Sequence, residues 1–230
     1  MHHLPRRLLA EFLGALLLTA VVIGSGITAQ RLSPHDSGLE LSENALATAL
    51  GLFGIIAAFA PISGAHVNPV ISLVDAALGR RRWLDAAAYI PTQVVGCVVG
   101  AILANLMFGR AAISISSADR LTPAHFLSEI VATAGLVLIV FLLATTGRHS
   151  FTAPAVGGYI GAAYLFTSSS SFANPAITIG RMFSDTFAGI APGSVPGFIG
   201  AQVIGGALGL LLVRLLTTAP HAQLREGTKQ

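Results

Sequence analysis

Long apolar stretches separated by short polar segments dominate the chain. Stretches long enough to cross a bilayer, which takes about 17 to 25 residues, occur near residues 7–29, 44–62, 84–108, 123–145, 153–170 and 196–217. This pattern predicts six transmembrane helices, so both termini lie on the same side of the membrane. The first stretch follows two arginines, as in a signal peptide, but it exceeds the usual signal core of about 7 to 15 residues and contains Glu11. We therefore expect this segment to be a first membrane helix that is retained, and not a signal peptide that is cleaved.

Two further apolar segments, at 63–79 and 168–187, do not fit as full spans. Each has a Gly/Ser/Ala-rich approach, then Asn-Pro, then helix-compatible sequence of about 10 residues, which makes a helix of about 15 Å, half of a hydrocarbon core of about 30 Å. Asn is among the best N-caps and Pro suits the first helical position. The pattern predicts two re-entrant half-helices that begin at Pro69 and Pro175.

The Asn-Pro elements also predict a pore chemistry. If the side-chain oxygens of Asn68 and Asn174 accept the N–H groups of Val70 and Ala176, the amide nitrogens keep donors that can point into a lumen. Each half-helix N-terminus carries about half a positive charge, so two of them facing a pore centre oppose cations. Neutral hydroxylated molecules are then expected to pass more easily than ions.

The two halves of the chain repeat one plan. Each begins with a span that carries one acidic residue near its start, Glu11 or Glu129, and reaches its Asn-Pro after the second span. Three spans per half require the second half to insert upside down relative to the first. We predict a single channel domain over 1–230 with inverted repeats over about 7–108 and 123–217. Irregular backbone at membrane depth is tolerated where it lines a watery cavity, which indicates a central pathway.

Composition narrows the class of protein. The apolar share is 53% and the charged share 10%, against about 25% charged residues in soluble domains, so an ordinary soluble globule is excluded. The 25 glycines are typical of membrane helices in close contact. A net charge of +3 is too weak to indicate a nucleic-acid partner. The single cysteine, Cys97, forms no intrachain disulfide or metal cluster and is expected to pack in the core.

Basic residues indicate the orientation. Nine lie on the side of the termini, namely Arg6, Arg7, Arg80, Arg81, Arg82, Arg148, Arg214, Arg225 and Lys229, and four on the other, namely Arg31, Arg110, Arg120 and Arg181. Because cytoplasmic loops carry the excess of Lys and Arg, we expect a multi-pass protein of the cell (inner) membrane with both termini in the cytoplasm.

The segments SGAHVNPV at 63–70 and FANPA at 172–176 resemble the two Asn-Pro-Ala boxes of the major intrinsic proteins, the aquaporins and aquaglyceroporins. The resemblance covers nearly the whole chain, including AEFLG at 10–14 and the closing GFIGAQVIGGALGLLLVRLL. It implies an all-α membrane protein with six transmembrane helices and two half-helices, assembled as a homotetramer in the lipid bilayer with a pore in every subunit. It implies no cofactor.

The resemblance also assigns roles to residues. It implies that Glu11 and Glu129 brace the re-entrant loops, a role that competes with a proton relay of the kind found in secondary transporters. It further implies a ladder of backbone carbonyls along the channel wall, from Gly64, Ala65, His66, Ser170, Ser171 and Phe172.

The chain departs from the family pattern at both boxes. The first ends in Val70, a conservative change, whereas the arginine that follows the second box in water channels and glycerol facilitators is replaced by Ile177. Counting back from the boxes without gaps places the other constriction positions at Thr48, Ala162 and Ser171. We therefore expect a wide, uncharged constriction.

Arg181 lies one helical turn beyond Ile177. It either restores a positive field at the outer mouth or, as we favour, anchors a helix end at the membrane interface.

A wide, uncharged filter suits bulky polyols and metalloid hydroxides such as arsenite or boric acid. In this respect the chain is similar to the arsenic-operon aquaglyceroporins of bacteria. We expect a passive channel for metalloid hydroxides and glycerol, with some water; the alternatives are a plain water/glycerol facilitator and a gradient-driven secondary transporter. No Ser/His/Asp or metal-ligand spacing occurs within the spans, so no catalytic or metal-binding residues are expected, and His66 is interpreted as a loop-packing residue.

Overall fold

The computed structural model describes residues 3–217, and Arg225 and Lys229 lie outside this range. Within it the chain forms eight α-helices and no strand, which confirms the all-α fold class. The helices are α1 (Leu4–Leu32), α2 (Ser37–Ser63), α3 (Pro69–Ala77), α4 (Trp83–Met107), α5 (Pro123–Thr145), α6 (Thr152–Phe166), α7 (Pro175–Gly180) and α8 (Val195–Thr217).

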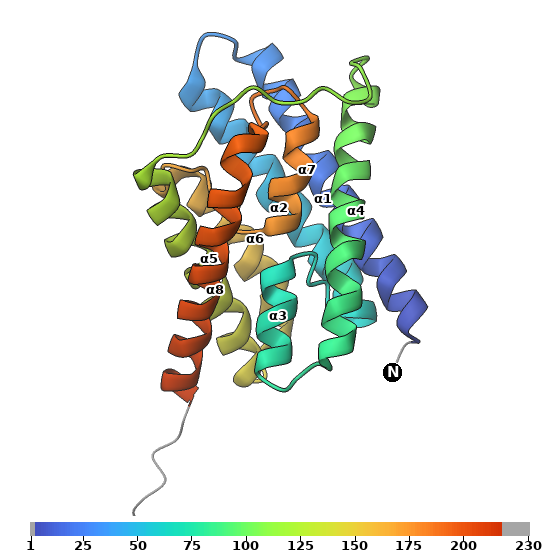
Figure 1. Ribbon diagram of the computed structural model, residues 1–230, viewed down its shortest axis with the longest axis vertical. Helices are drawn as coiled ribbons and strands as arrows, with labels where there is room; N and C mark the ends of the chain where they lie inside the picture. The colour runs from blue at the N-terminus through green and yellow to red at the C-terminus, as the bar shows by residue number, and fades with distance from the viewer. Residues whose placement is uncertain (1–2, 218–230) are drawn as a thin grey trace, which may run out of the picture.

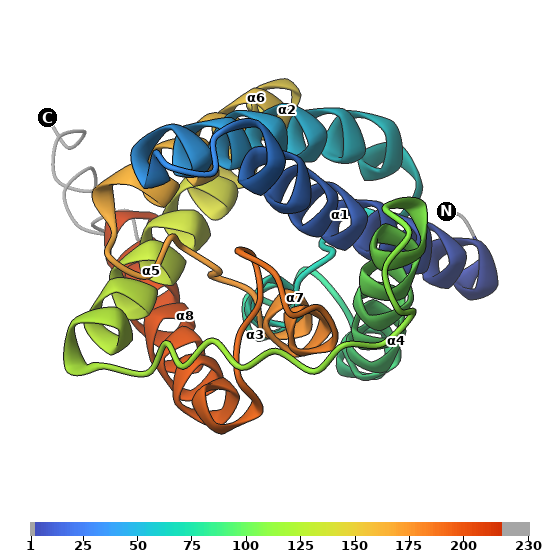
Figure 2. The same cartoon turned by 90° about the horizontal axis from the view of Figure 1, so that it is seen from above.

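The long helices form a ring around the two short ones. In Figure 2, α3 and α7 occupy the centre, enclosed by α1, α2, α6, α5, α8 and α4. Around this ring α1 packs against α2 and α4, while α5 packs against α8 and α6, and α2 packs against α6. The two short helices lie one above the other along the long axis (Figure 1). The centre of the molecule is therefore built from the two segments that contain Asn-Pro.

Two ends of the molecule can be distinguished in Figure 1. The lower end holds the start of α1, the end of α8 and the connections at 78–82 and 146–151, whereas the upper end holds the connections at 33–36 and 108–122. The start of α1 and the end of α8 thus lie at the same end, as an even number of crossings requires.

Among residues 3–217, five helical segments are long and apolar enough to cross a membrane, namely α1, α2, α4, α5 and a segment at 192–217 that contains α8. The span expected at 153–170 differs, because α6 has 15 residues and ends at Phe166. The chain leaves the helix there since Ser169 is needed elsewhere: its hydroxyl donates to Glu129 Oε1 at 2.6 Å.

Close helix contacts depend on glycine. A Cβ atom at Gly100 of α4 would lie 2.2 Å from the carbonyl oxygen of Leu16 in α1, and one at Gly205 of α8 would lie 2.5 Å from that of Ile130 in α5. The α1–α4 and α5–α8 pairs are therefore in backbone contact, as small residues permit in membrane helix pairs.

Replacing Gly100 with alanine tests this packing. Gly100→Ala forces α1 and α4 apart, so we expect a loss of about 1 to 3 kcal/mol of stability, as for other overpacked cores. The control is Gly158→Ala in α6, where a Cβ has no atom within 4 Å. That change should leave stability equal or higher because alanine favours helix by up to about 1 kcal/mol. Thermal unfolding in detergent measures both, and equal midpoints for the two variants would contradict the packing argument.

Candidate functional site

Both half-helices begin at the proline of their Asn-Pro pair, as predicted. The side-chain oxygen of Asn68 accepts the backbone N–H of Val70 at 2.9 Å, and that of Asn174 accepts the N–H of Ala176 at 3.0 Å. Each asparagine therefore caps the helix that follows it.

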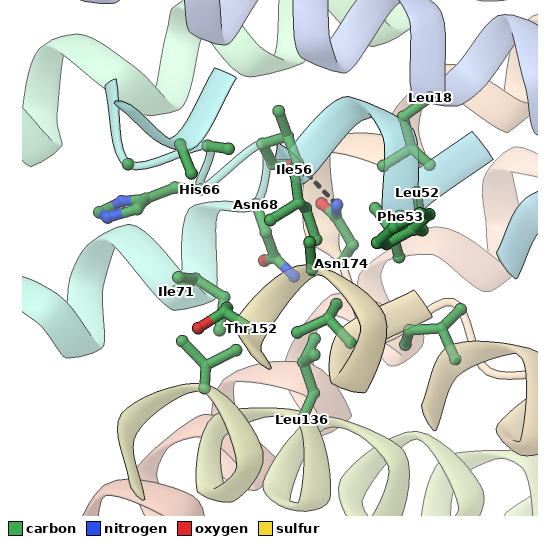
Figure 3. A pocket seen from close by; sticks show the side chains of 18 of the residues that line it. Leu18, Leu52, Phe53, Ile56, His66, Asn68, Ile71, Leu136, Thr152 and Asn174 are labelled. Atoms are coloured by element: carbon green, nitrogen blue, oxygen red, sulfur yellow. Dashed lines mark hydrogen bonds between the residues drawn. The ribbon is translucent and has the colours of Figure 1, made fainter. Parts of the chain in front are cut away.

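The two caps are also tied to one another's loops. Asn68 Nδ2 donates to the carbonyl oxygen of Ala173 at 2.8 Å, and Asn174 Nδ2 donates to that of Val67 at 2.8 Å. A carboxamide has two N–H donors, so one on each asparagine joins the halves and one remains for the lumen. The two side chains lie next to each other (Figure 3).

Glu11, fully buried in α1, holds the first re-entrant loop. Oε1 accepts the Ser63 hydroxyl at 2.6 Å and the His66 N–H at 3.0 Å. Oε2 accepts the Val67 N–H and the Gln93 side-chain amide, both at 2.7 Å. One carboxylate thus joins four donors, from the end of α2, from the loop and from α4.

Glu129, fully buried in α5, makes the same four bonds in the second half. Oε1 accepts the Ser169 hydroxyl at 2.6 Å and the Phe172 N–H at 2.9 Å. Oε2 accepts the Ala173 N–H at 2.8 Å and the Gln202 side-chain amide at 2.7 Å. Both glutamates therefore brace a re-entrant loop against a long helix.

The braced loops have a strained backbone. Val67 and Ala173 have φ of 40° and 48°, and Ala65 and Ser171, at the equivalent positions two residues earlier, have 46° and 45°. Positive φ is uncommon outside glycine and is an outlier for a β-branched residue such as Val67, at a cost of about 1 to 3 kcal/mol each. The glutamate bonds to the Val67 and Ala173 N–H groups offset this cost.

A cavity of about 910 Å³ runs from the lower end past both asparagines. Its mouth is charged, where Asp75 pairs with Arg81 at 3.0 Å. The residues expected along the pore that do line it are Thr48, Gly64, Ala65, His66, Asn68, Ser171, Phe172, Asn174 and Ile177.

His66 packs in its loop as interpreted from the sequence. Its Nδ1 lies 3.0 Å from the Ser72 hydroxyl, and its Nε2 lies 3.3 Å from Asp75 Oδ2.

Other expected residues lie outside the cavity lining. Val70 points to α8, where a Cβ at Gly206 would come within 2.5 Å of Val70 Cγ1. Ser170 is half-buried and is not among the residues that line the cavity. Buried helix residues complete this group, namely Pro69, Pro175 and Ala176.

The expectation for Ala162 is wrong. Ala162 lies on the exposed face of α6, whereas Val156, Ile160 and Tyr164 line the cavity. Residues four apart share one helix face, and position 162 falls between them on the other side. A gapless count from the second box therefore selects the wrong residue, and the aromatic Tyr164 lies where a small alanine was expected.

Arg181 is also not an interface anchor. Its side chain is only 2% exposed, it lines the cavity one turn beyond Ile177, and its Nε donates to the carbonyl of Ala188. The guanidinium carbon lies 3.4 Å from the centroid of the Phe172 ring. The expectation of an uncharged constriction is therefore wrong at the upper end of the cavity.

Sequence reasoning missed the two glutamines that bond to the glutamates. Gln93 and Gln202 are both fully buried, and they open the repeated motifs QVVG and QVIG in α4 and α8. That repeat was the available signal.

These features define a class of protein: a membrane-spanning helical channel built around two half-helices. The model of the family named major intrinsic protein matches residues 2–171. The chain belongs to the major intrinsic protein family.

Known relatives agree with this assignment. The chain is 45% identical over 228 residues to aquaglyceroporin AqpS of Rhizobium meliloti (strain 1021), covering 99% of this chain and 97% of that protein. It is 30% identical over 236 residues to probable aquaporin TIP2-2 of Oryza sativa subsp. japonica, covering 93% and 88%. The solved structure of the aquaglyceroporin from Plasmodium falciparum shares the fold with a TM-score of 0.70 at 21% identity, covering 93% of this chain and 95% of that one.

Substituting Glu129 tests the bracing. In Glu129→Gln, an amide NH₂ group, which donates hydrogen bonds, replaces a carboxylate oxygen, which only accepts them. Because donors then face a donor, we expect the free energy of unfolding to fall by about 1 to 3 kcal/mol. We also expect solute flux to be lost as the second loop relaxes. Glu43→Gln is the control, since Glu43 is half-buried and accepts one bond, from the Ser33 hydroxyl. Thermal unfolding and vesicle flux measure both, and wild-type values for Glu129→Gln would contradict the assigned role.

Proposed function

We propose that the protein is a passive channel for small neutral solutes, namely glycerol and metalloid hydroxides such as arsenite, with some water. The observation that carries this proposal is the cavity of about 910 Å³ that reaches both cross-tied asparagines. Its wall combines apolar side chains with a few fixed polar groups, which suits molecules that carry hydroxyl groups and no charge.

The distribution of polar groups supports neutral solutes. Leu52, Ile56 and Leu136 form apolar surface around the asparagines (Figure 3). The remaining N–H of Asn68 and of Asn174 can donate to a solute oxygen. Two half-helix N-termini meet there with partial positive charge, so a cation is opposed where a neutral polyol finds donors.

The names of similar proteins support glycerol as a solute of the channel. AqpS is an aquaglyceroporin, and a probable glycerol uptake facilitator protein of Thermotoga maritima is 28% identical over 166 residues, covering 66% of this chain and 70% of that protein. A plain water/glycerol facilitator is the alternative that these names allow.

The residue that follows the second Asn-Pro box supports metalloid hydroxides as further solutes. Ile177 lines the cavity with an apolar side chain at the position where water channels and glycerol facilitators carry an arginine, and Thr48 also lines it, in place of an aromatic residue. Arsenite and boric acid are small, hydroxylated and largely undissociated at neutral pH, so they present the same chemistry as glycerol to this wall.

A gradient-driven transporter is less well supported. It needs a titratable group deep in the pathway, yet neither Glu11 nor Glu129 lines the cavity, and each carboxylate is already engaged by four donors. The carboxylate that does line it, Asp75, lies at the mouth and is paired with Arg81.

The setting that we propose is a homotetramer in the cell (inner) membrane with the lower end in the cytoplasm. The described basic residues at that end include Arg6, Arg80 and Arg148, in keeping with the excess of positive charge on cytoplasmic loops. Exposed leucines such as Leu9 and Leu50 supply apolar surface for lipid and for neighbouring subunits.

Flux measurements in proteoliposomes test the function. Stopped-flow light scattering should show entry of water, glycerol, arsenite and boric acid faster than in protein-free vesicles, with no dependence on a proton or sodium gradient. Acceleration of water and glycerol alone would favour the plain facilitator, and gradient-dependent flux would favour the transporter. No acceleration for any of the four solutes would refute the channel proposal.

Replacing Ile177 tests the proposed filter. Ile177→Arg adds a guanidinium one turn from Arg181, so glycerol and arsenite flux should fall several-fold while water flux persists. Ile177→Leu, which keeps the side chain apolar and similar in volume, should conduct like the wild type. Unchanged arsenite flux in Ile177→Arg would show that position 177 does not limit the passage of solutes.

A further inference from the structure

A second hollow lies on the outer surface of the helix ring, in a groove between α1 and α4. Leu9 and Val95, which border it, are 57% and 54% exposed. None of its lining residues lines the central cavity, so the groove opens to the surroundings of the protein, which in a membrane are lipid. It holds about 390 Å³ and is lined by Leu8, Leu9, Phe12, Pro91, Thr92 and Val95.

The groove is held in shape from both ends. A Cβ atom at Gly96 of α4 would lie 2.6 Å from the carbonyl oxygen of Phe12 in α1, so the two helices are in backbone contact at the upper end of the groove. At its lower end Arg7 of α1 pairs with Asp85 of α4 at 3.0 Å and donates to the Tyr89 hydroxyl at 2.9 Å. The space between these contacts is therefore a fixed feature of the α1–α4 pair.

Positive charge gathers below the groove. The start of α1 lies beside α4 at the lower end of the molecule (Figure 1). Arg6 lies in the first turn of α1, Arg82 directly precedes α4, and both are exposed. Among residues 3–217 neither makes an ion pair, and the neighbouring carboxylate of Asp85 is already paired with Arg7. The groove therefore ends in net positive charge.

The side chains around these arginines indicate the depth of the groove in the membrane. Trp83 and Leu84, at the start of α4, are 59% and 70% exposed. Tryptophan is enriched at the membrane–water interface, where its ring lies at the level of the headgroups. Arginines near helix ends likewise extend their charge to this level and keep their stems in apolar surroundings. The arginines thus lie at headgroup level and the groove at the level of acyl chains.

We propose that this groove binds an anionic phospholipid of the leaflet at the lower end. One acyl chain lies against Leu9, Phe12 and Val95, and the guanidinium groups of Arg6 and Arg82 bind the phosphate headgroup. Charge complementarity selects this occupant, because a zwitterionic headgroup brings a positive charge of its own toward two arginines without acidic partners. Guanidinium groups also match the geometry of phosphate oxygens. The site is independent of the proposed channel function.

Lipid binding to the purified protein in detergent tests the headgroup contacts. Native mass spectrometry should show tighter binding of phosphatidylglycerol than of phosphatidylcholine with the same acyl chains. In the double variant Arg6→Gln, Arg82→Gln the affinity for phosphatidylglycerol should fall about fivefold per arginine. The matched control is Arg148→Gln, which removes an exposed arginine from the connection at 146–151, at the same end of the molecule. It should bind phosphatidylglycerol like the wild type.

A groove-filling substitution tests the acyl-chain contacts. Val95→Trp places a large ring in the groove, so the affinity for phosphatidylglycerol should fall several-fold although both arginines remain. Because Val95 is exposed to lipid, this change leaves the core packing intact. The control is Val99→Trp, since Val99 lies one turn further along α4, is 36% exposed and does not line the groove. Soluble glycerol 3-phosphate, which has the headgroup charge and no acyl chain, should not displace the lipid.

Three results would overturn the proposal. The first is equal affinity for the two lipids, and the second is wild-type affinity for phosphatidylglycerol in either the double arginine variant or Val95→Trp. The third is a change in the number of subunits in Val95→Trp with lipid binding unchanged, which would make the groove a contact between copies of the chain. Because the measured quantity is lipid binding, each result stands whether or not the protein conducts glycerol.

Discussion

Two buried carboxylates hold the backbone of this protein in a shape that it would not keep unaided. Left-handed backbone at Val67 and Ala173 costs free energy, and an unpaired carboxylate at membrane depth costs more. Glu11 and Glu129 solve both problems at once, because the N–H groups that the unusual backbone turns inward are the donors that the carboxylates need. Removing either side of this arrangement leaves the other unsatisfied, so the loops, the half-helices and the cavity depend on it together.

The second constraint acts between the halves. Each asparagine uses its oxygen for its own half-helix and one N–H for the loop of the other half. The two half-helix N-termini would repel one another through their partial positive charges, and the reciprocal bonds hold them together in spite of this. The same bonds leave one side-chain N–H free on each asparagine, and this N–H is the donor that a solute meets in the pore.

Features that depend on adjacent residues could be predicted from the sequence, whereas features that depend on tertiary packing could not. The half-helix starts at Pro69 and Pro175 were predictable because capping needs only adjacent residues. The length of α6 was not, because it ends where Glu129 draws Ser169 out of the helical path. Tyr164 was missed for a related reason: the face that a helix turns to a cavity depends on its packing, which a count along the chain does not contain.

The two departures from the Asn-Pro-Ala pattern differ in what they touch. Val70 packs against Gly206 of α8 and does not line the cavity, so its extra methyl groups are accommodated by a residue that has no side chain. Ile177 lines the cavity, and the positive charge absent at that position lies one turn further on, at Arg181. The low charge of the chain therefore does not extend through the whole pore: an apolar wall near the asparagines is followed by the buried guanidinium of Arg181. A neutral solute meets these in sequence, whereas a filter with arginine directly after the second box would present charge and constriction at that box.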